Sequence, residues 1–178
     1  MARLKHDGYG TLETNLVDYS IMESQNVVID ATEFPNGAEV GTIVGINKVA
    51  KKFVKPTDAL LKGMLVNSER LKSQDRQGLK NFIVLPGENG TALIMRNGFK
   101  FTTNTCGSTE FATENALDAA LKALATTPLF AKWNANGILD ITATSAGAAF
   151  AVTDYRTVPN GQPGVQFQVI REELLSVQ

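Results

Sequence analysis

The sequence is poor in the residues that most often bind metals or attack substrates: it has one cysteine and one histidine in 178 residues. Cys106 has no second cysteine with which to form an internal disulfide, so disulfides do not hold this fold together. Zinc sites draw several Cys, His or carboxylate ligands from short spacings, whereas His6 and Cys106 lie far apart in the chain. We therefore expect neither a metal nor another cofactor.

The sequence also lacks an excess of charge of one sign, with 17 basic and 18 acidic residues and a net charge of -1. Proteins that grip a nucleic-acid backbone usually carry a clear positive excess, so nucleic acid is not the expected partner. The start "MARLKHDGYG" lacks the apolar core of a signal peptide, and no run of about 18 apolar residues is present to cross a bilayer. We expect no membrane partner, and a chain that is kept in the cytoplasm or assembled there into something larger.

The first 26 residues are polar, with glycines on both sides of Tyr9, which favours an extended chain over a helix. We predict an N-terminal arm over residues 1–26 that is weakly ordered alone or lies against a neighbour; the alternative is a floppy terminus. The apolar residues of the arm that we expect to be buried on a neighbouring subunit are Leu12, Leu16, Val17 and Ile21.

Residues 27–178 have the pattern of a β-rich globular domain. Apolar and polar residues alternate in stretches such as "VQFQVI", which is typical of strands with one buried face. Asn-Gly favours tight hairpin turns, because glycine readily takes a positive φ and asparagine tolerates it. We therefore predict a mainly β fold with one helix (α+β), a turn-rich antiparallel sandwich or barrel, with Ala92–Arg96 and Phe99–Thr103 forming a hairpin. The pairs are Asn36-Gly37, Asn89-Gly90, Asn97-Gly98, Asn136-Gly137 and Asn160-Gly161.

One segment has helical periodicity and predicts an amphipathic helix at about residues 109–126. Its apolar stripe has the spacing i, i+3, i+4, i+7, and Pro128 ends it. Ser108 or Thr109 is expected to cap its start. The stripe consists of Leu117, Ala120, Leu121 and Leu124.

No residue pattern in the sequence is an enzyme signature. His6, the only histidine, lies in the predicted arm, from which a Ser-His-Asp or Cys-His arrangement would have to recruit it. Cys106 lies before the predicted helix start, where a helix dipole lowers a thiol pKa, so a hydrolase or thiol enzyme built on Cys106 is a third hypothesis; the other interpretation is a buried structural cysteine. We expect no catalytic site.

The one basic cluster of the sequence lies in "NKVAKKFVKP". Basic residues interleaved with an aromatic can follow a phosphate backbone, which makes a β-barrel that binds single-stranded nucleic acid the alternative function. The other interpretation is a solvated hairpin edge, where lysines prevent edge-to-edge pairing of sheets. The cluster consists of Lys48, Lys51, Lys52, Phe53 and Lys55.

Four stretches, in order "GAEVGTIV", "KKFVKP", "FIVLPGENGTALIMRNG" and "LDAALKALATTPLF", give residues 27–133 a resemblance to tailed-bacteriophage head decoration proteins and related virion structural proteins. The resemblance implies a non-enzymatic capsid decoration or head-fibre-base component that binds and stabilises a phage particle. It implies the major capsid protein or other virion proteins as partners, a homo-oligomer, and a place in the virion after assembly in the host cytoplasm. The chain is longer than the compact decoration proteins by a strand-rich C-terminal region, which leaves its site of attachment, and head or tail placement, open.

Overall fold

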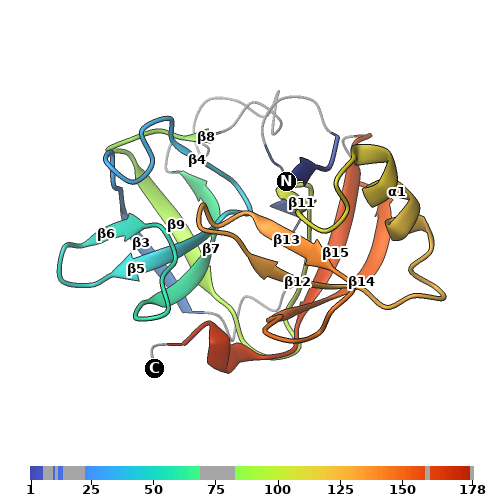
Figure 1. Ribbon diagram of the computed structural model, residues 1–178. Coiled ribbons are helices and arrows are strands. Elements are labelled where there is room, and N and C mark those ends of the chain that lie inside the picture. Colours follow the sequence, from blue (N-terminus) through green and yellow to red (C-terminus); the bar gives the residue numbers. More distant parts are fainter. Residues whose placement is uncertain (6–9, 11, 14–22, 69–82, 159–160, 177–178) are drawn as a thin grey trace.

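The computed structural model of the protein describes residues 1–5, 10, 12–13, 23–68, 83–158 and 161–176. These residues form a closed five-stranded barrel, an eight-stranded sheet beside it, a small two-stranded sheet and one α-helix (Figure 1). The prediction of a mainly β fold with one helix is therefore confirmed.

The barrel is built from the first half of the chain, in the order β3-β6-β5-β7-β9, with β9 pairing back onto β3. Its pairs are antiparallel except for β3 and β6, which run parallel. A short ribbon of β4 (Ala38–Glu39) and β8 (Ile83–Val84) makes the two-stranded sheet. The barrel strands are β3 (Glu23–Ile29), β5 (Ile43–Asn47), β6 (Lys52–Val54), β7 (Leu61–Ser68) and β9 (Asn89–Ile94).

The eight-stranded sheet has the order β1-β11-β13-β12-β14-β15-β10-β2. Strands β10 and β11 lie near opposite edges of this sheet, yet only Asn104 and Thr105 separate them in the chain. The sheet must therefore curl until its edges meet at these two residues, and we call it the curled sheet. Its strands are β1 (Ala2–Arg3), β2 (Leu12–Glu13), β10 (Lys100–Thr103), β11 (Cys106–Ser108), β12 (Phe130–Trp133), β13 (Leu139–Thr142), β14 (Phe150–Thr157) and β15 (Pro163–Val169).

Two strands of the barrel belong to both hydrophobic cores. Val44 of β5 and Leu65 of β7 point into the barrel and pack in its core. Their neighbours Ile43 and Met64 are also fully buried, but they pack in the core of the curled sheet. Because successive side chains of a strand point to opposite faces, β5 and β7 are buried on both faces. They therefore join the barrel to the curled sheet, and we call these the two bodies of the fold.

The Asn-Gly pairs do not all mark hairpins. Gly98 has φ 84°, and the amide of Phe99 donates to the carbonyl of Arg96 (3.1 Å), so the chain reverses there. The predicted hairpin is nevertheless wrong, because β9 stays in the barrel while β10 pairs with β15 and β2. The turn instead carries the chain from one body to the other.

The Asn89-Gly90 pair does not form a turn, and its glycine lies in a closely packed part of a strand. Gly90 lies within β9 and pairs with β3 and β7. A β-carbon on Gly90 would lie 2.9 Å from Cδ1 of Leu65, so a larger residue would require the Leu65 side chain to move inside the barrel. Gly37, Gly137 and Gly161 have positive φ, but Asn36 and Asn136 do not, so these two turns are not of the kind in which both residues of the pair take a positive φ.

The described part of the predicted arm contacts the body of the same chain. Strand β1 pairs with β11 and β2 pairs with β10, so the N-terminal segment supplies both edge strands of the curled sheet. Leu4 is 3% exposed in the core, and Leu12 packs partly buried against it. Strand β3 begins at Glu23, so the predicted boundary after residue 26 lies inside a strand. His6, Leu16, Val17 and Ile21 lie outside the described residues.

The helix α1 spans Glu114–Lys122 and is shorter than the predicted 109–126. Thr113 caps it, since its hydroxyl accepts a hydrogen bond from the Ala116 amide (3.2 Å). Ser108, one of the predicted caps, instead accepts from the amides of Glu110 and Phe111 in a preceding turn, which delays the helix. Leu117 and Leu121 are buried. Within the described part of the chain, no helix has the length and apolar character to cross a membrane.

Candidate functional site

The β5–β6 hairpin holds the predicted basic cluster at the outer end of the barrel (Figure 1). Asn47 pairs with Lys52 at the end of the ladder, which leaves residues 48–51 as the loop. Asn47 Oδ1 accepts a hydrogen bond from the amide of Ala50 (2.9 Å), so a side chain of the strand fixes the loop. We call residues 48–51 the hairpin tip.

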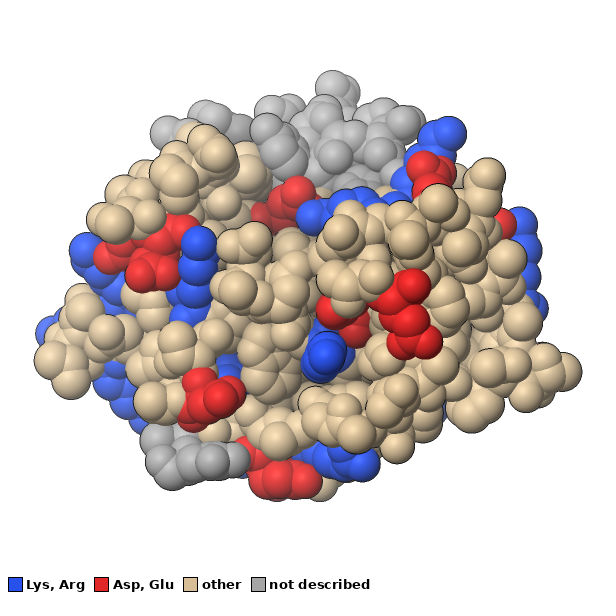
Figure 2. All heavy atoms as spheres, in the orientation of Figure 1, with Lys and Arg blue, Asp and Glu red and all other residues tan. Residues whose placement is uncertain are grey.

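The lysines of the cluster are not equivalent. Lys48 and Lys51 are exposed, and neither forms an ion pair with a described residue. Lys52 Nζ lies 2.9 Å from Asp30 Oδ2, and this hydrogen bond lowers the pKa of Asp30 below its usual value. Lys55 is half-buried and lines a recess beside the barrel. Figure 2 shows Lys and Arg side chains along this outer edge of the barrel.

Phe53 does not join the lysines at the surface, contrary to the prediction. It is 0% exposed and packs in the barrel core. The cause is strand alternation, because Lys52 points outward and the next side chain must point inward. The hairpin therefore presents no aromatic ring on which a base could stack.

Two further properties mark the hairpin tip. Val49 is 96% exposed, which is unusual for a large apolar side chain in this fold. Lys51 has φ 51° and is the one non-glycine residue with positive φ in the described ranges. This left-handed conformation costs a non-glycine residue about 1 kcal/mol. The loop thus holds an exposed valine and, two residues later, a strained lysine.

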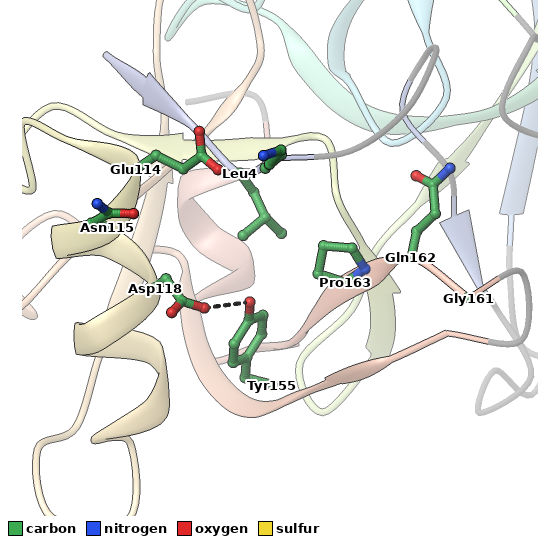
Figure 3. Close-up of a pocket in the computed structure, with 9 residues that line it drawn as sticks. Leu4, Glu114, Asn115, Asp118, Tyr155, Gly161, Gln162 and Pro163 are labelled. Carbon is green, nitrogen blue, oxygen red and sulfur yellow. Dashed lines mark hydrogen bonds between the residues drawn. The ribbon is translucent and has the colours of Figure 1, made fainter.

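A recess of about 390 Å³ lies between α1 and the end of the β14–β15 hairpin (Figure 3). Tyr155 and Leu4 lie on one side of it, and Gln162 and Pro163 on another. Asp118 Oδ1 accepts a hydrogen bond from the Tyr155 hydroxyl (2.9 Å), and its Oδ2 lies 2.6 Å from Lys122 Nζ. Both carboxylate oxygens of Asp118 are thus already engaged.

The pKa shifts of Tyr155 and Asp118 do not suit these two groups to acid–base work near neutral pH. Burial and the hydrogen bond to Asp118 raise the pKa of Tyr155 to about 12. Hydrogen bonds from Lys122 and Tyr155 lower the pKa of Asp118. A general acid or base works best with a pKa near the working pH, and these two groups have been moved away from it. The pair therefore looks structural, joining α1 to β14.

A second recess, of about 370 Å³, lies where the barrel meets the N-terminal segment. Glu39 Oε2 accepts hydrogen bonds from Arg3 Nη2 (2.8 Å) and from the amide of Gly10 (3.2 Å). Arg156 Nη2 binds Glu13 in the same way (2.9 Å). These two ion pairs fasten the N-terminal strands to the body. Sequence reasoning missed them, since the partners lie far apart in the chain and no local pattern joins them.

Cys106 is fully buried in β11, and burial raises the pKa of its thiol to about 12. A nucleophilic cysteine needs a thiolate and access to substrate, and Cys106 has neither feature. The described residues contain no group of three or more His, Cys, Asp or Glu side chains placed to hold a metal ion.

Lys62 is the one buried lysine that the described residues contain, at 1% exposure, and we did not predict a role for it. Its ammonium lies 5.6 Å from the ring centre of Trp133 and 3.5 Å from the carbonyl oxygen of Asp58. Burial lowers its pKa. A lysine inside the apolar run "LLKGMLV" is the signal that could have revealed it.

No family model, no curated protein and no solved structure matches this chain. The function must therefore be argued from its residues and their arrangement.

Proposed function

We propose that the chain is a non-enzymatic structural protein of a tailed-phage virion, a decoration or fibre-base component bound to the particle. The observation that carries this proposal is the hairpin tip, where an exposed valine and two exposed lysines without an ion pair to a described residue lie on a β body with buried cores. Such a body offers a stable support for contacts with other subunits. The resemblance of residues 27–133 to virion proteins supports the same function.

The chemistry of the described residues is in keeping with a binding role. The single thiol is buried and protonated at neutral pH, and the Asp118–Tyr155 pair in the larger recess is engaged in a structural hydrogen bond. We infer that the partners are the major capsid protein or other virion proteins, and that the chain acts as a homo-oligomer, as virion components commonly do.

The test is quantitative peptide mass spectrometry on density-purified particles from infected cells that make the chain. We expect many copies per particle, in a fixed ratio to the major shell protein, and retention after a wash that removes an abundant host cytoplasmic protein. Absence of the chain from particles would contradict the proposal.

The predicted docking role of the arm needs a narrower test than deletion of residues 1–26, because Leu4 and Arg3 hold the body and β3 begins at Glu23. Replacement of Leu16, Val17 and Ile21 by serine leaves these contacts in place. If the arm docks, we expect lower occupancy on particles with an unchanged melting temperature. Unchanged occupancy would show that these three residues do not dock.

Single-stranded nucleic-acid binding is the second candidate function, favoured by the exposed Lys48 and Lys51 beside Lys52. It predicts retention on oligothymidine at low salt, with a loss of affinity as salt rises. The absence of retention at about 50 mM NaCl would exclude it.

A further inference from the structure

The hairpin tip carries two features that are uncommon in the described residues. Val49 is 96% exposed, so it contributes almost nothing to either core. Lys51 takes a left-handed conformation that glycine or asparagine would adopt with less strain. Strain that no buried contact explains often marks a functional position.

The tip is also held rigid from below. Asn47 Oδ1 binds the amide of Ala50, the Lys52–Asp30 ion pair fixes the base of the hairpin, and Phe53 anchors the same strand in the barrel core. A loop that is already ordered loses less conformational freedom when it binds. The backbone that carries Lys48, Val49 and Lys51 is thus already ordered.

We propose that the hairpin tip is the docking contact of this protein, with Val49 entering a shallow apolar recess of an acidic protein surface and Lys48 and Lys51 facing carboxylates around it. The partner is a shell protein of the particle, so this inference rests on the proposed function and names the contact through which it works.

The shape and composition of the tip favour a protein partner over nucleic acid. Binding of single strands commonly combines a basic groove with exposed aromatic rings, whereas this hairpin is a projection whose phenylalanine is buried. A lone exposed valine gains little from a phosphate backbone, but it gains from an apolar recess. Lysines at the rim of such a contact provide charge complementarity and speed association.

The experiment measures binding of the purified chain to purified particles that lack it, at about 50 and about 300 mM NaCl. The test variants are K48E/K51E and V49D, which leave Asn47, Lys52 and Phe53 unchanged. The matched control is R96E/K100E, which makes the same change of charge on another part of the surface, at residues without a described ion pair. Melting temperatures confirm that each variant folds.

We expect wild-type binding that weakens with salt, a loss of affinity of about tenfold or more for K48E/K51E and for V49D, and a change within about twofold for the control. Equal binding by wild type and K48E/K51E would overturn the docking site while leaving the proposed function in place. Failure of the wild type to bind particles would overturn both. Retention on oligothymidine that K48E/K51E abolishes would replace the protein partner with nucleic acid.

Discussion

The barrel and the curled sheet fill their cores with different side chains. The curled sheet packs three phenylalanines against each other: the ring of Phe101 lies 5.6 Å from that of Phe167 and 5.8 Å from that of Phe150. The barrel core has two phenylalanines, Phe34 and Phe53, among aliphatic residues, and Gly90 packs close to Leu65 within it. We therefore expect the larger core of the curled sheet to contribute more to stability than the barrel core, while the barrel presents the exposed hairpin.

The two bodies are nevertheless joined at several points. Ile43 and Met64 of the barrel strands belong to the core of the curled sheet. The amide of Ile43 donates to the carbonyl of Gly137 (2.8 Å), and the amide of Lys62 donates to the carbonyl of Leu175 (2.9 Å). We therefore expect them to unfold together.

The largest loss in the free energy of unfolding is expected from Phe150→Ala, because this change removes a fully buried ring from the aromatic cluster. Its cost should be about 4 kcal/mol, against about 3 kcal/mol for Phe53→Ala in the smaller core. Urea unfolding followed by Trp133 fluorescence and by circular dichroism should give one coincident transition for both variants. Two separate transitions for Phe53→Ala would show that the barrel unfolds alone.

Gly137→Ala should break the junction between the bodies. Gly137 has φ 77°, and a methyl group there would overlap the carbonyl oxygen of Ile43. We expect a loss of about 3 kcal/mol in the free energy of unfolding. Gly147→Ala is the control, since Gly147 has φ 68° but open space around it, and should cost about 1 kcal/mol. Equal losses would mean that only backbone strain matters at Gly137.

Lys62→Met tests the buried charge between the bodies. A lysine whose pKa is lowered on folding binds protons less readily in the folded chain, so it destabilises the fold below its folded pKa. This destabilisation decreases as the pH rises toward 10.5, the ordinary pKa of a lysine. We expect the variant to be about 1 kcal/mol more stable at pH 7, with the gap narrowing by pH 10.

Lys48→Met is the matched control, because Lys48 is exposed and unpaired among the described residues. It should change stability by less than about 0.5 kcal/mol at either pH. A constant gap for Lys62→Met across the pH range would show that the gain comes from packing and not from charge.

The smallest effect on the free energy of unfolding is expected from Lys51→Gly, which relieves the backbone strain of the left-handed conformation at the hairpin tip. A gain of about 0.5 kcal/mol, or about 1–2 °C in melting temperature, should follow, measured by calorimetry. Lys48→Gly should give no gain, since its φ is not positive. A loss of stability in Lys51→Gly would show that Lys51 contributes contacts that outweigh its strain.

Local patterns predicted the elements well, but they did not predict which strands pair. The leucine stripe of α1 and the alternation in β15 depend on near neighbours and are visible in the sequence. The reversal at Asn97-Gly98 is equally local, yet the amide of Gly98 donates to the carbonyl of Val169 (2.9 Å), a partner that only the folded chain brings near. That contact helps to send β10 to the curled sheet instead of back along β9.

The candidate site could be predicted only in part, because the sequence shows which residues are neighbours in the chain but not which of them are buried. The lysines are adjacent in sequence and lie together on the hairpin, whereas Phe53 was misplaced because strand alternation outweighs proximity in sequence. The exposure of Val49 and the backbone of Lys51 depend on the length of the loop, which the sequence pattern did not define.

The curled edges of the sheet have a consequence for how the chain folds as it is synthesised. Residues 2–3 and 12–13 are made first, but β1 and β2 pair with β11 and β10, which follow the whole barrel in the chain. All five barrel strands can leave the ribosome before β10 does. We therefore expect the barrel to close early during translation, whereas β1 and β2 can pair only after β10 and β11 have been made. Until β10 and β11 are made, residues 2–3 and 12–13 have no strand to pair with and stay open to chaperones or to pairing with another chain.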